Sequence, residues 1–489
     1  MDIQREALIG IVGAGNVTDD PSILESYAAD YSAMPRRVPW FVVRPQNAAQ
    51  VQALVAWANQ TKTALVPVSS GSPHFNGDTV PSQPGSVIVD LSGIKQIKRI
   101  DRRNKMVVIE PGVTYADLTP ALAKEGLRIS RPLLPRPNKS VVASLLERQP
   151  TTIPRFNFSL PEPLRNCGVV WGSGEIAFTG ESGNGIQDLE DQWKRGGAQV
   201  DPKGPNATDL MRLLTGAQGT MGIVIWASIK CELIPAASHS VFVAAEKLEQ
   251  LVDFCYQAER IRIGDELMCV NAAQLASMIG SDAETIAMLK ETLPPWTIII
   301  RLAGAGHFPS ERVEVQKLDI RRLAQKCGLT LLNSLPGIAS AEIENAVERD
   351  SGGTYYKLKS KGGCREIFFL TTLDKAPQFV SSVLSTAEKN RYPATNVGIY
   401  IQPQHQGVSQ HVEFSFPFDP ADTRQTAQVD KMVAAATESV MAGGAYFSRP
   451  YGPWAEMVYS RDATATKILH VVKGIVDPNN VLNPGKLCF

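Results

Sequence analysis

One histidine, one glutamate and one arginine near the C-terminal end carry side chains suited to moving a proton and to binding an anion. His411 and Glu413 are two residues apart, so on a strand both point to the same face. There they could act together as a proton acceptor or form half of a metal site. Arg449 could pair bidentately with a phenolate or a carboxylate. Tyr446 and Tyr451 are close enough in sequence to orient the same ligand. A structural histidine and a surface arginine are the alternative interpretations.

The loop at 67–78, PVSSGSPHFNGD, combines small hydroxyl residues with two glycines after a strand-like segment. Its backbone N–H groups and serine hydroxyls could converge on one anion, so a pyrophosphate could sit there without a lysine or an arginine. An ordinary Ser/Gly-rich surface loop is the alternative. The earlier Gly13-Ala14-Gly15 lacks the third glycine of a dinucleotide fingerprint, because Thr18 stands at that position. It indicates a turn near an N-terminal helix.

Alternating strands and helices would position the loop at 67–78. Residues 39–67 predict a strand, a helix whose apolar residues recur at helical spacing, and a second strand that leads into the loop. Further strands are predicted at 86–91, 97–101 and 106–112, followed by a helix that stops near Gly126. The first part of the chain is therefore an α/β region.

The middle of the chain is rich in proline between 132 and 163, which predicts an extended loop of functional importance. A fresh alternation of strands and helices starts near 236, so we place a domain boundary near 235. The last twenty residues contain turn signals between short apolar pieces. They predict a tail that packs back on another domain.

Composition excludes several classes of protein. The 489 residues include 49 Lys plus Arg and 49 Asp plus Glu, and the resulting zero net charge argues against a mainly electrostatic nucleic-acid binder. No stretch reaches 18 uninterrupted apolar residues, so no membrane-spanning segment is expected. The seven cysteines form no C-x-x-C pair, which favours a reducing, cytoplasmic compartment. We expect a homo-oligomer.

Four segments in order resemble the FAD-binding domain of the vanillyl-alcohol oxidase and p-cresol methylhydroxylase flavoprotein family. They are SVIVDLSGIKQIKRIDRRNKMVVIEPGVTYADL, KSVVASLLERQPTTIP, LLTGAQGTMGIVIWASIKCELIP and DPNNVLNPGKL. The resemblance covers about residues 38–235 and the C-terminal twenty residues. It implies an α+β fold with a two-subdomain FAD-binding domain at 1–235, an α/β cap domain with an antiparallel sheet at 236–465, and a tail at 466–489 that returns to the FAD domain.

The same resemblance implies FAD as the cofactor and assigns its contacts residue by residue. The pyrophosphate loop matches Ser69, Ser70, Gly71, Ser72, Pro73, His74 and Gly77, and the adenine side matches Glu110, Pro111, Gly112 and Val113. Beside the flavin, the matches are Ser140, Val141, Ser144 and Leu145. The main chain is expected to approach the cofactor at Gly219, Gly222, Ile223 and Val224, and the C-terminal match comprises Asn483 and Lys486. Because His74 lies one residue closer to Gly77 than in the covalent loop pattern, we expect non-covalent FAD.

The resemblance also implies the reaction, which is transfer of a hydride to FAD from an alcohol or benzylic carbon of a small aromatic or phenolic substrate. Arg449, Tyr446 and Tyr451 would orient the substrate, although Ser448 stands where the family has a tyrosine, and His411 or Glu413 would take the proton. Asn157 stands where phenol-oxidising members carry an acid near the flavin, and Asn cannot take a proton.

Two other functions stay open. A D-2-hydroxy-acid dehydrogenase of the lactate or glycolate type would place Arg449 on the substrate carboxylate. The metal-binding members of that group have a His…His-x-Asn pattern, but here the spacing from His405 to His411 is one residue short and Arg449 stands at the later Glu position, so no metal is expected. A non-catalytic flavin subunit that passes electrons to a redox partner protein is the second alternative.

Overall fold

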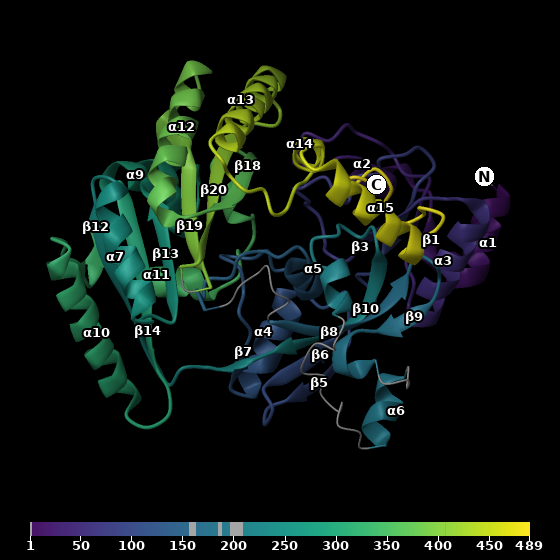
Figure 1. Ribbon diagram of the computed structural model, residues 1–489, viewed down its shortest axis with the longest axis horizontal. Helices are drawn as coiled ribbons and strands as arrows, with labels where there is room; N and C mark the ends of the chain where they lie inside the picture. Colours follow the sequence, from purple (N-terminus) through teal and green to yellow (C-terminus); the bar gives the residue numbers. More distant parts are fainter. Residues whose placement is uncertain (1, 156–162, 184–187, 196–208, 406) are drawn as a thin grey trace.

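Two parts built around separate β-sheets lie side by side in the computed structural model, which describes residues 2–155, 163–183, 188–195, 209–405 and 407–489 (Figure 1). The chain up to Leu233 forms the part with two sheets, and one large antiparallel sheet that begins at Ala237 organises the other. The predicted α+β architecture is confirmed. Among the described residues, no helix has the length and apolar character needed to cross a membrane.

The first sheet carries the loop at 67–78 at the end of a strand. Its order is β1 (Val17–Thr18), β2 (Phe41–Val43), β4 (Val87–Asp90) and β3 (Leu65–Val68), with β2, β4 and β3 parallel. Helix α3 (Ala48–Thr61) joins β2 to β3; the Asn47 side chain caps its first turn and its apolar stripe is buried. Helix α1 (Asp2–Val12) precedes β1 in the chain, and α2 (Pro21–Ala28) lies between β1 and β2.

The second sheet is antiparallel throughout and supports the other side of the first part. Its order is β5 (Ile97–Asp101), β6 (Met106–Ile109), β10 (Gly222–Lys230), β8 (Leu164–Trp171) and β9 (Ile176–Phe178). A short ladder pairs β7 (Leu127–Arg128) with β11 (Glu232–Leu233). The helices here are α4 (Tyr115–Lys124), which starts at a capping box of Thr114 and Asp117, α5 (Val141–Leu146) and α6 (Leu189–Lys194).

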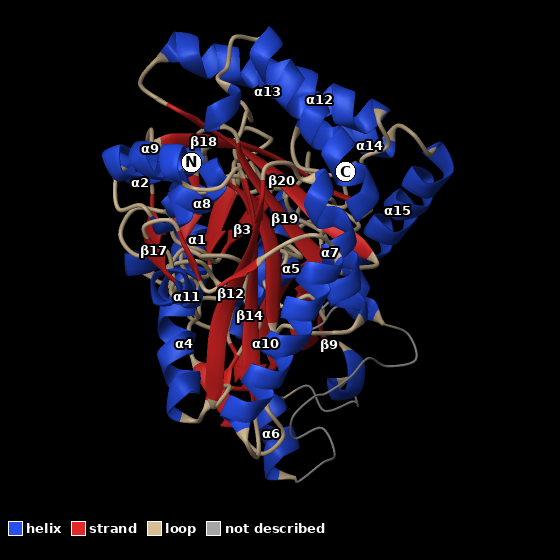
Figure 2. Ribbon diagram, turned by 90° about the vertical axis from the view of Figure 1, so that its left-hand side faces the viewer, coloured by secondary structure: helices blue, strands red, loops and turns tan. Residues whose placement is uncertain are grey.

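The cap sheet has seven strands and is covered by helices on its outside (Figure 2). Its order is β15 (Leu331–Leu332), β12 (Ala237–Ala245), β14 (Trp296–Gly304), β13 (Glu266–Asn271), β19 (Gly398–Gln404), β20 (Ser409–Phe418) and β18 (Gly363–Thr371). The helices that bury one face are α7 (Glu249–Arg260), α10 (Pro309–Lys326), α12 (Ala376–Lys389) and α13 (Thr423–Ala442). Helices α8 (Ala272–Ile279), α9 (Ala283–Thr292) and α11 (Ser340–Glu348) pack on the other, and β16 (Ser334–Leu335) pairs with β17 (Ile338–Ala339).

The register of the cap sheet puts three chemically different side chains in one row. Phe368 on β18 is paired with Glu413 on β20, which is paired with Tyr400 on β19. Because side chains alternate between faces along a strand, Glu366 and His411 lie on the same face as this row. The spacing of His411 and Glu413 in the sequence predicted their shared face, but not their neighbours from β18 and β19.

The end of the chain returns to the first part. Helix α14 (Pro453–Tyr459) follows α13, and α15 (Ala463–Val476) and the C-terminus lie beside the first part (Figure 1). Leu482 bridges to Leu65 at the start of β3, and Lys486 Nζ donates to the carbonyls of Gly77 and Val80 at 2.7 Å each. The tail therefore braces the strand and loop that face the cap.

Candidate active site

One groove runs between the loop after β3, helix α5 and the cap sheet. It consists of two cavities that share Pro67, Ser69, Asp78, Ala143 and Glu147. The end that we call the reaction cavity is lined by charged and aromatic side chains, among them Tyr355, Tyr356, Lys357, Glu366, Phe368, Tyr400, Glu413 and Arg449. The other end, which we call the apolar cavity, is lined by Leu91, Pro111, Val142, Leu146, Leu214, Ile223 and Val224, with Gly219 and Gly222.

The loop after β3 is held in place by an arginine that the sequence analysis did not single out. Arg136 donates hydrogen bonds to the carbonyls of Gly71, at 2.8 Å, and of Pro73. With these carbonyls turned to Arg136, Ser69 and Ser70 remain on the wall of the reaction cavity. The loop thus offers hydroxyl groups on one side and is anchored on the other.

His74 belongs to the same loop and lines the reaction cavity. Burial, together with the positive charges of Arg136 and Lys139, lowers the pKa of His74 to about 3. Its ring stacks on Tyr27 of α2, with ring centres 6.5 Å apart. At neutral pH the imidazole is therefore uncharged.

Helix α5 turns Val142, Ala143 and Leu146 to the groove, whereas Val141 and Leu145 pack in the core behind it. Ser140 caps the helix, because its hydroxyl accepts a hydrogen bond of 3.0 Å from the Ala143 N–H. The residues assigned from the resemblance, Ser140, Val141, Ser144 and Leu145, belong to this segment but line neither cavity. The packing of a six-residue helix decides how it is rotated about its own axis, and therefore which of its side chains face the groove.

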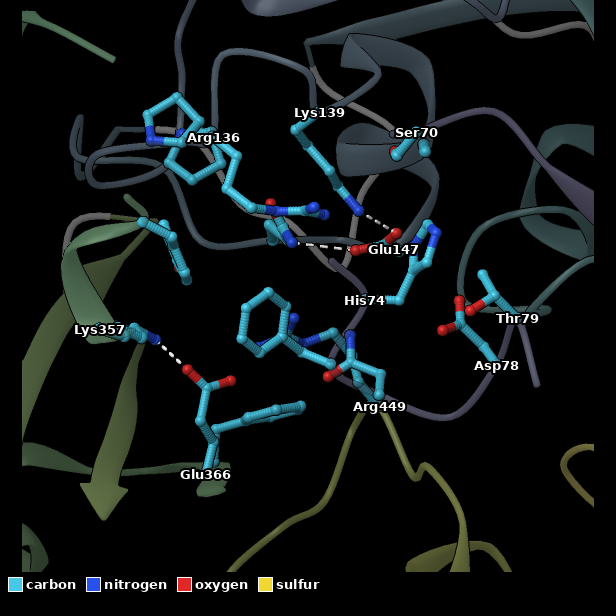
Figure 3. A pocket seen from close by; sticks show the side chains of 18 of the residues that line it. Ser70, His74, Asp78, Thr79, Arg136, Lys139, Glu147, Lys357, Glu366 and Arg449 are labelled. Atoms are coloured by element: carbon cyan, nitrogen blue, oxygen red, sulfur yellow. Dashed lines mark hydrogen bonds and ion pairs between the residues drawn. The ribbon is translucent and has the colours of Figure 1, made fainter. Parts of the chain in front are cut away.

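A chain of hydrogen bonds orients a buried ion pair beside α5. The Tyr115 hydroxyl donates to Ser144 at 3.0 Å, and Ser144 donates to the Gln149 carbonyl at 2.8 Å. The Gln149 amide then donates to Glu147 at 2.9 Å, and Glu147 pairs with Lys139 across the groove wall (Figure 3). Ser144 therefore contributes by orienting Glu147.

Asp78 points into the groove opposite this ion pair (Figure 3). Burial and the neighbouring negative charge of Glu147 raise the pKa of Asp78 to about 7, against the opposing effect of Lys139. The backbone of Asp78 is fixed by Asn483, whose amide donates to the Asp78 carbonyl at 2.9 Å and to the Gln218 carbonyl at 2.7 Å. Asn483 thereby joins the loop after β3 to the turn that precedes β10.

Close backbone approach makes the groove suitable for a long, flat, phosphate-bearing cofactor. Gly219 has a φ of +73°, and a Cβ there would lie 2.6 Å from Pro67 Cγ on the groove wall. A Cβ on Gly222 would lie 2.5 Å from Val169 Cγ1. Hydroxyl groups and cations lie at the loop, and apolar side chains at the far end, which fits a pyrophosphate joined to an adenine.

Arg449 enters the reaction cavity next to Phe368, with its guanidinium carbon 4.2 Å from the centre of that ring (Figure 3). Two contacts position it: the backbones of Tyr446 and Leu370 are hydrogen-bonded to each other, and Arg148 donates to the Ser448 carbonyl at 2.8 Å. Burial lowers the pKa of Arg449, but a guanidinium stays protonated in proteins. The cavity therefore has a fixed cation at one wall.

Lys357 lies between two carboxylates on the opposite wall. Its ammonium pairs with Glu366 on β18 and with Glu413 on β20. Burial alone would lower the pKa of Lys357, but the two carboxylates outweigh it and hold the pKa well above its usual value. Burial raises the pKa of Glu366, whereas Lys357 and His411 hold that of Glu413 below its usual range.

The two histidines of the possible metal site do not come together. His405 is exposed in the turn between β19 and β20, whereas His411 is 1% exposed and lies 3.4 Å from Glu413. Burial lowers the pKa of His411 to about 4, so its ring is neutral. Within the described residues no group of three His, Cys, Asp or Glu side chains is placed to hold a metal ion, and the cation between the carboxylates is Lys357.

The other candidate residues are distributed unevenly. Tyr451 is buried and lines the apolar cavity, whereas the Tyr446 side chain is 64% exposed. Glu110 pairs with Lys98 at 3.2 Å, away from the groove. Gly112 takes part in a tight backbone turn, because a Cβ there would lie 2.5 Å from the Ser92 carbonyl oxygen, and Val113 is core. Ser72 accepts a hydrogen bond from Asn138, and Asn157 lies outside the described residues.

Sequence reasoning missed Asp78, Arg136, Lys357 and Glu366 as groove residues. Asp78 is the last residue of the loop at 67–78. Its place in that loop could have identified it as a groove residue. Lys357 and Glu366 lie in the cap, where the resemblance is weaker. Only the folded structure shows that Lys357 joins Glu366 to Glu413.

Comparisons with known proteins agree with this geometry. Residues 39–145, which include the loop after β3, match the family described as FAD binding domain. The chain is 28% identical to the D-2-hydroxyglutarate dehydrogenase of Stutzerimonas stutzeri, over 98% of this chain and 97% of that protein. It is 20% identical to the mitochondrial D-lactate dehydrogenase (cytochrome) of Arabidopsis thaliana, over 92% and 73%. The structure of p-cresol methylhydroxylase with substrate bound has a TM-score of 0.85 at 16% identity, covering 100% of this chain and 96% of that one.

The chain is a flavoprotein: residues 39–145 match an FAD binding domain, and the whole chain has the fold of p-cresol methylhydroxylase and of a 4-ethylphenol oxidase. Its cofactor is FAD, and the flavoprotein is an FAD-dependent oxidoreductase. The predicted fold and cofactor are thereby confirmed, and the similar proteins include D-lactate and D-2-hydroxyglutarate dehydrogenases as well as p-cresol methylhydroxylase.

Proposed function

We propose that this flavoprotein oxidises a small phenolic compound at the carbon para to its hydroxyl group. The observation that carries the proposal is a cavity with aromatic walls and one guanidinium: Tyr355, Phe368 and Tyr400 with Arg449. Aromatic side chains favour a flat ring, and a guanidinium stabilises the oxygen of a phenol as it loses its proton. The non-covalent FAD would lie along the groove, with its pyrophosphate at Ser69 and Ser70 and its adenine in the apolar cavity.

The chemistry divides between the cofactor and the chain. Bound FAD supplies an acceptor for two electrons as a hydride. Arg449 binds the phenol oxygen and stabilises its negative charge, while Phe368, at 4.2 Å, keeps the guanidinium in place and excludes water. For 4-hydroxybenzyl alcohol, loss of one hydride from the CH–OH carbon and one proton gives 4-hydroxybenzaldehyde.

The proton acceptor that fits best is Glu366. Its pKa is raised by burial, so its carboxylate is a stronger base than that of Glu413, whose pKa is held down by Lys357. Lys357 contacts both carboxylates. When Glu366 takes up a proton and becomes neutral, the Lys357 ammonium therefore remains paired with Glu413. His411 contacts Glu413 and acts by positioning it.

A 2-hydroxy acid is the second candidate substrate, and the near full-length similarity to D-2-hydroxyglutarate dehydrogenase favours it. Arg449 would then pair with the substrate carboxylate instead of a phenol oxygen. The two candidates differ in the rest of the ligand: the aromatic walls of the reaction cavity favour a ring, and the carboxylates of Glu366 and Glu413 disfavour a second acidic group.

The test is anaerobic reduction of the FAD-loaded protein by candidate substrates. The loss of flavin absorbance is the readout. We expect bleaching by 4-hydroxybenzyl alcohol or 4-ethylphenol, with benzyl alcohol, which lacks the phenol oxygen, as the matched control. D-2-Hydroxyglutarate and D-lactate test the second candidate in the same experiment. Bleaching by the hydroxy acids with no response to either phenol would refute the proposal and establish its rival.

A further inference from the structure

A third cavity lies at the junction of the two parts, on the far side of the reaction-cavity wall. It is lined by the segment 31–34, the middle of helix α13 and helix α14, and its lining includes Met34, Val433, Thr437 and Trp454. It shares Phe75, Asn76, Glu366 and Phe368 with the reaction cavity. The two cavities are therefore separated by one layer of side chains.

Two rings form that layer. Phe75 stacks on Tyr31 of the third cavity with ring centres 5.2 Å apart, and meets Tyr355 of the reaction cavity edge-on at 5.2 Å. The second ring is that of Phe368. It meets Trp454 of the third cavity edge-on, with ring centres 5.1 Å apart, and contacts Arg449 in the reaction cavity. Each ring thus contacts aromatic side chains of the third cavity on one side and residues of the reaction cavity on the other.

Of the described polar residues that line the third cavity, Thr437 is the one with a buried side-chain atom that lacks a partner. Thr437 is 2% exposed, and within the described part of the chain its Oγ1 has no hydrogen-bond partner. A buried hydroxyl without a partner is costly, and a ligand hydroxyl placed there would satisfy it. Aromatic and apolar side chains such as Met34, Val433 and Trp454, together with this hydroxyl, match the chemistry of a small phenol.

One helix face lines the cavity and leads from its buried end to the surface. Asp430, Val433, Ala434 and Thr437 recur at helical spacing along α13, and Ala434 is exposed at the rim whereas Thr437 is buried. Arg365 of β18 pairs with Asp430 at 2.7 Å and donates to the Tyr31 carbonyl. That arginine ties the walls of both parts together around the cavity.

We propose that this third cavity is an antechamber, a second binding site for the phenolic substrate on its way to the reaction cavity. The inference rests on the proposed function for the identity of the ligand. The substrate binds with its hydroxyl on Thr437 and its ring between Trp454 and Met34, and rotation of Phe75 or Phe368 opens the passage to Arg449.

The test uses 4-bromophenol, which has no carbon that can give up a hydride, with crystals of the FAD-loaded protein. We expect two anomalous bromine peaks, one near Arg449 and one in the antechamber. Thr437→Val removes the hydroxyl with little change in shape and should weaken binding at the antechamber by about three- to tenfold, the factor of one neutral hydrogen bond. A bromine peak in the reaction cavity alone, at saturating 4-bromophenol, would overturn the proposal.

A second pair of variants tests transit. Ala434→Trp fills the rim of the antechamber, and Ala427→Trp, seven residues earlier on the same helix and also exposed, is the matched control. We expect the first to lower the second-order rate constant of flavin reduction severalfold, with the limiting rate at saturation unchanged. Equal rate constants for both variants would overturn the route. Bromine in the antechamber without flavin reduction by any phenol would support the site and refute phenol oxidation, so the two failures are distinguishable.

Discussion

The guanidinium carbon of Arg449 lies 4.2 Å from the centre of the Phe368 ring, at the wall of the reaction cavity. This contact holds the cation where, under the proposed function, the substrate oxygen would bind. Arg449→Met should lower the rate of flavin reduction by the substrate by about 10²–10³-fold, the usual effect of removing one charge-stabilising donor. Stopped-flow absorbance at saturating substrate measures this rate.

The FAD content of Arg449→Met should match that of the native protein, because Arg449 lies at the substrate end of the groove. Arg424→Met on the exposed start of α13 is the control and should leave the rate unchanged. An Arg449→Met protein that reduces its flavin at the native rate would remove Arg449 from the reaction.

Lys357 keeps two buried carboxylates together, so its removal should be costly. Lys357→Met leaves Glu366 and Glu413 facing each other without a cation, and we expect the free energy of unfolding to fall by about 3–5 kcal/mol. Urea denaturation measures this change. The double variant Lys357→Met/Glu366→Gln should recover part of the loss. If the double variant were less stable than the single one, charge repulsion would not be the cause.

Asp78 should make FAD affinity depend on pH. Its pKa is raised to about 7, so the carboxyl is neutral below that pH and negative above it, where it repels a pyrophosphate. We expect FAD to bind about tenfold more weakly at pH 8 than at pH 6. This factor corresponds to a change of about one unit in the pKa of Asp78 when FAD binds. In Asp78→Asn the dissociation constant, measured by flavin fluorescence, should not change over this range.

The same carboxyl affects the stability of the FAD-free protein in a defined direction. Because its folded pKa lies above the unfolded value of 3.8, its contribution is fully present below pH 3.8 and is lost as the pH rises towards 7. Asp19→Asn, at an exposed acid, is the control for both measurements. Parallel pH profiles for Asp78→Asn and the native protein would contradict the assignment.

His411 should act through Glu413 and not as the base itself. Its pKa is lowered to about 4, so it does not titrate between pH 5.5 and 9. His411→Asn should lower turnover by less than about tenfold, below the 10²–10⁴-fold expected for loss of a general base, and the shape of the pH profile should stay the same. Steady-state kinetics across this pH range provide the measurement. Loss of one limb of the profile would show that His411 is the base.

The FAD should be released by acid. His74 is the only histidine of the loop after β3, and its ring stacks on Tyr27. Precipitation with trichloroacetic acid should leave the flavin in the supernatant, and its absorbance is the readout. Yellow colour retained in the pellet of the native protein and lost in His74→Ala would instead establish a covalent bond.

The order of strands and helices and a loop suited to a phosphate could be predicted from local pattern, whereas the antiparallel cap and FAD were implied by the family resemblance. Apolar periodicity shows which face of α3 is buried, and the small residues after β3 indicate a loop that can approach a phosphate. The pair His411 and Glu413 was assigned to one face from spacing alone, and the structure has both on β20.

Only the tertiary structure decided which side chains meet. The rotation of α5, which turns Val142 to the groove and Val141 to the core, depends on packing against the second sheet. Lys357, in the short helical turn before β18, reaches Glu413 on β20 across 56 residues of sequence. Such contacts join segments that are far apart in the chain, and their energy comes from burial and charge pairing that exist only after folding.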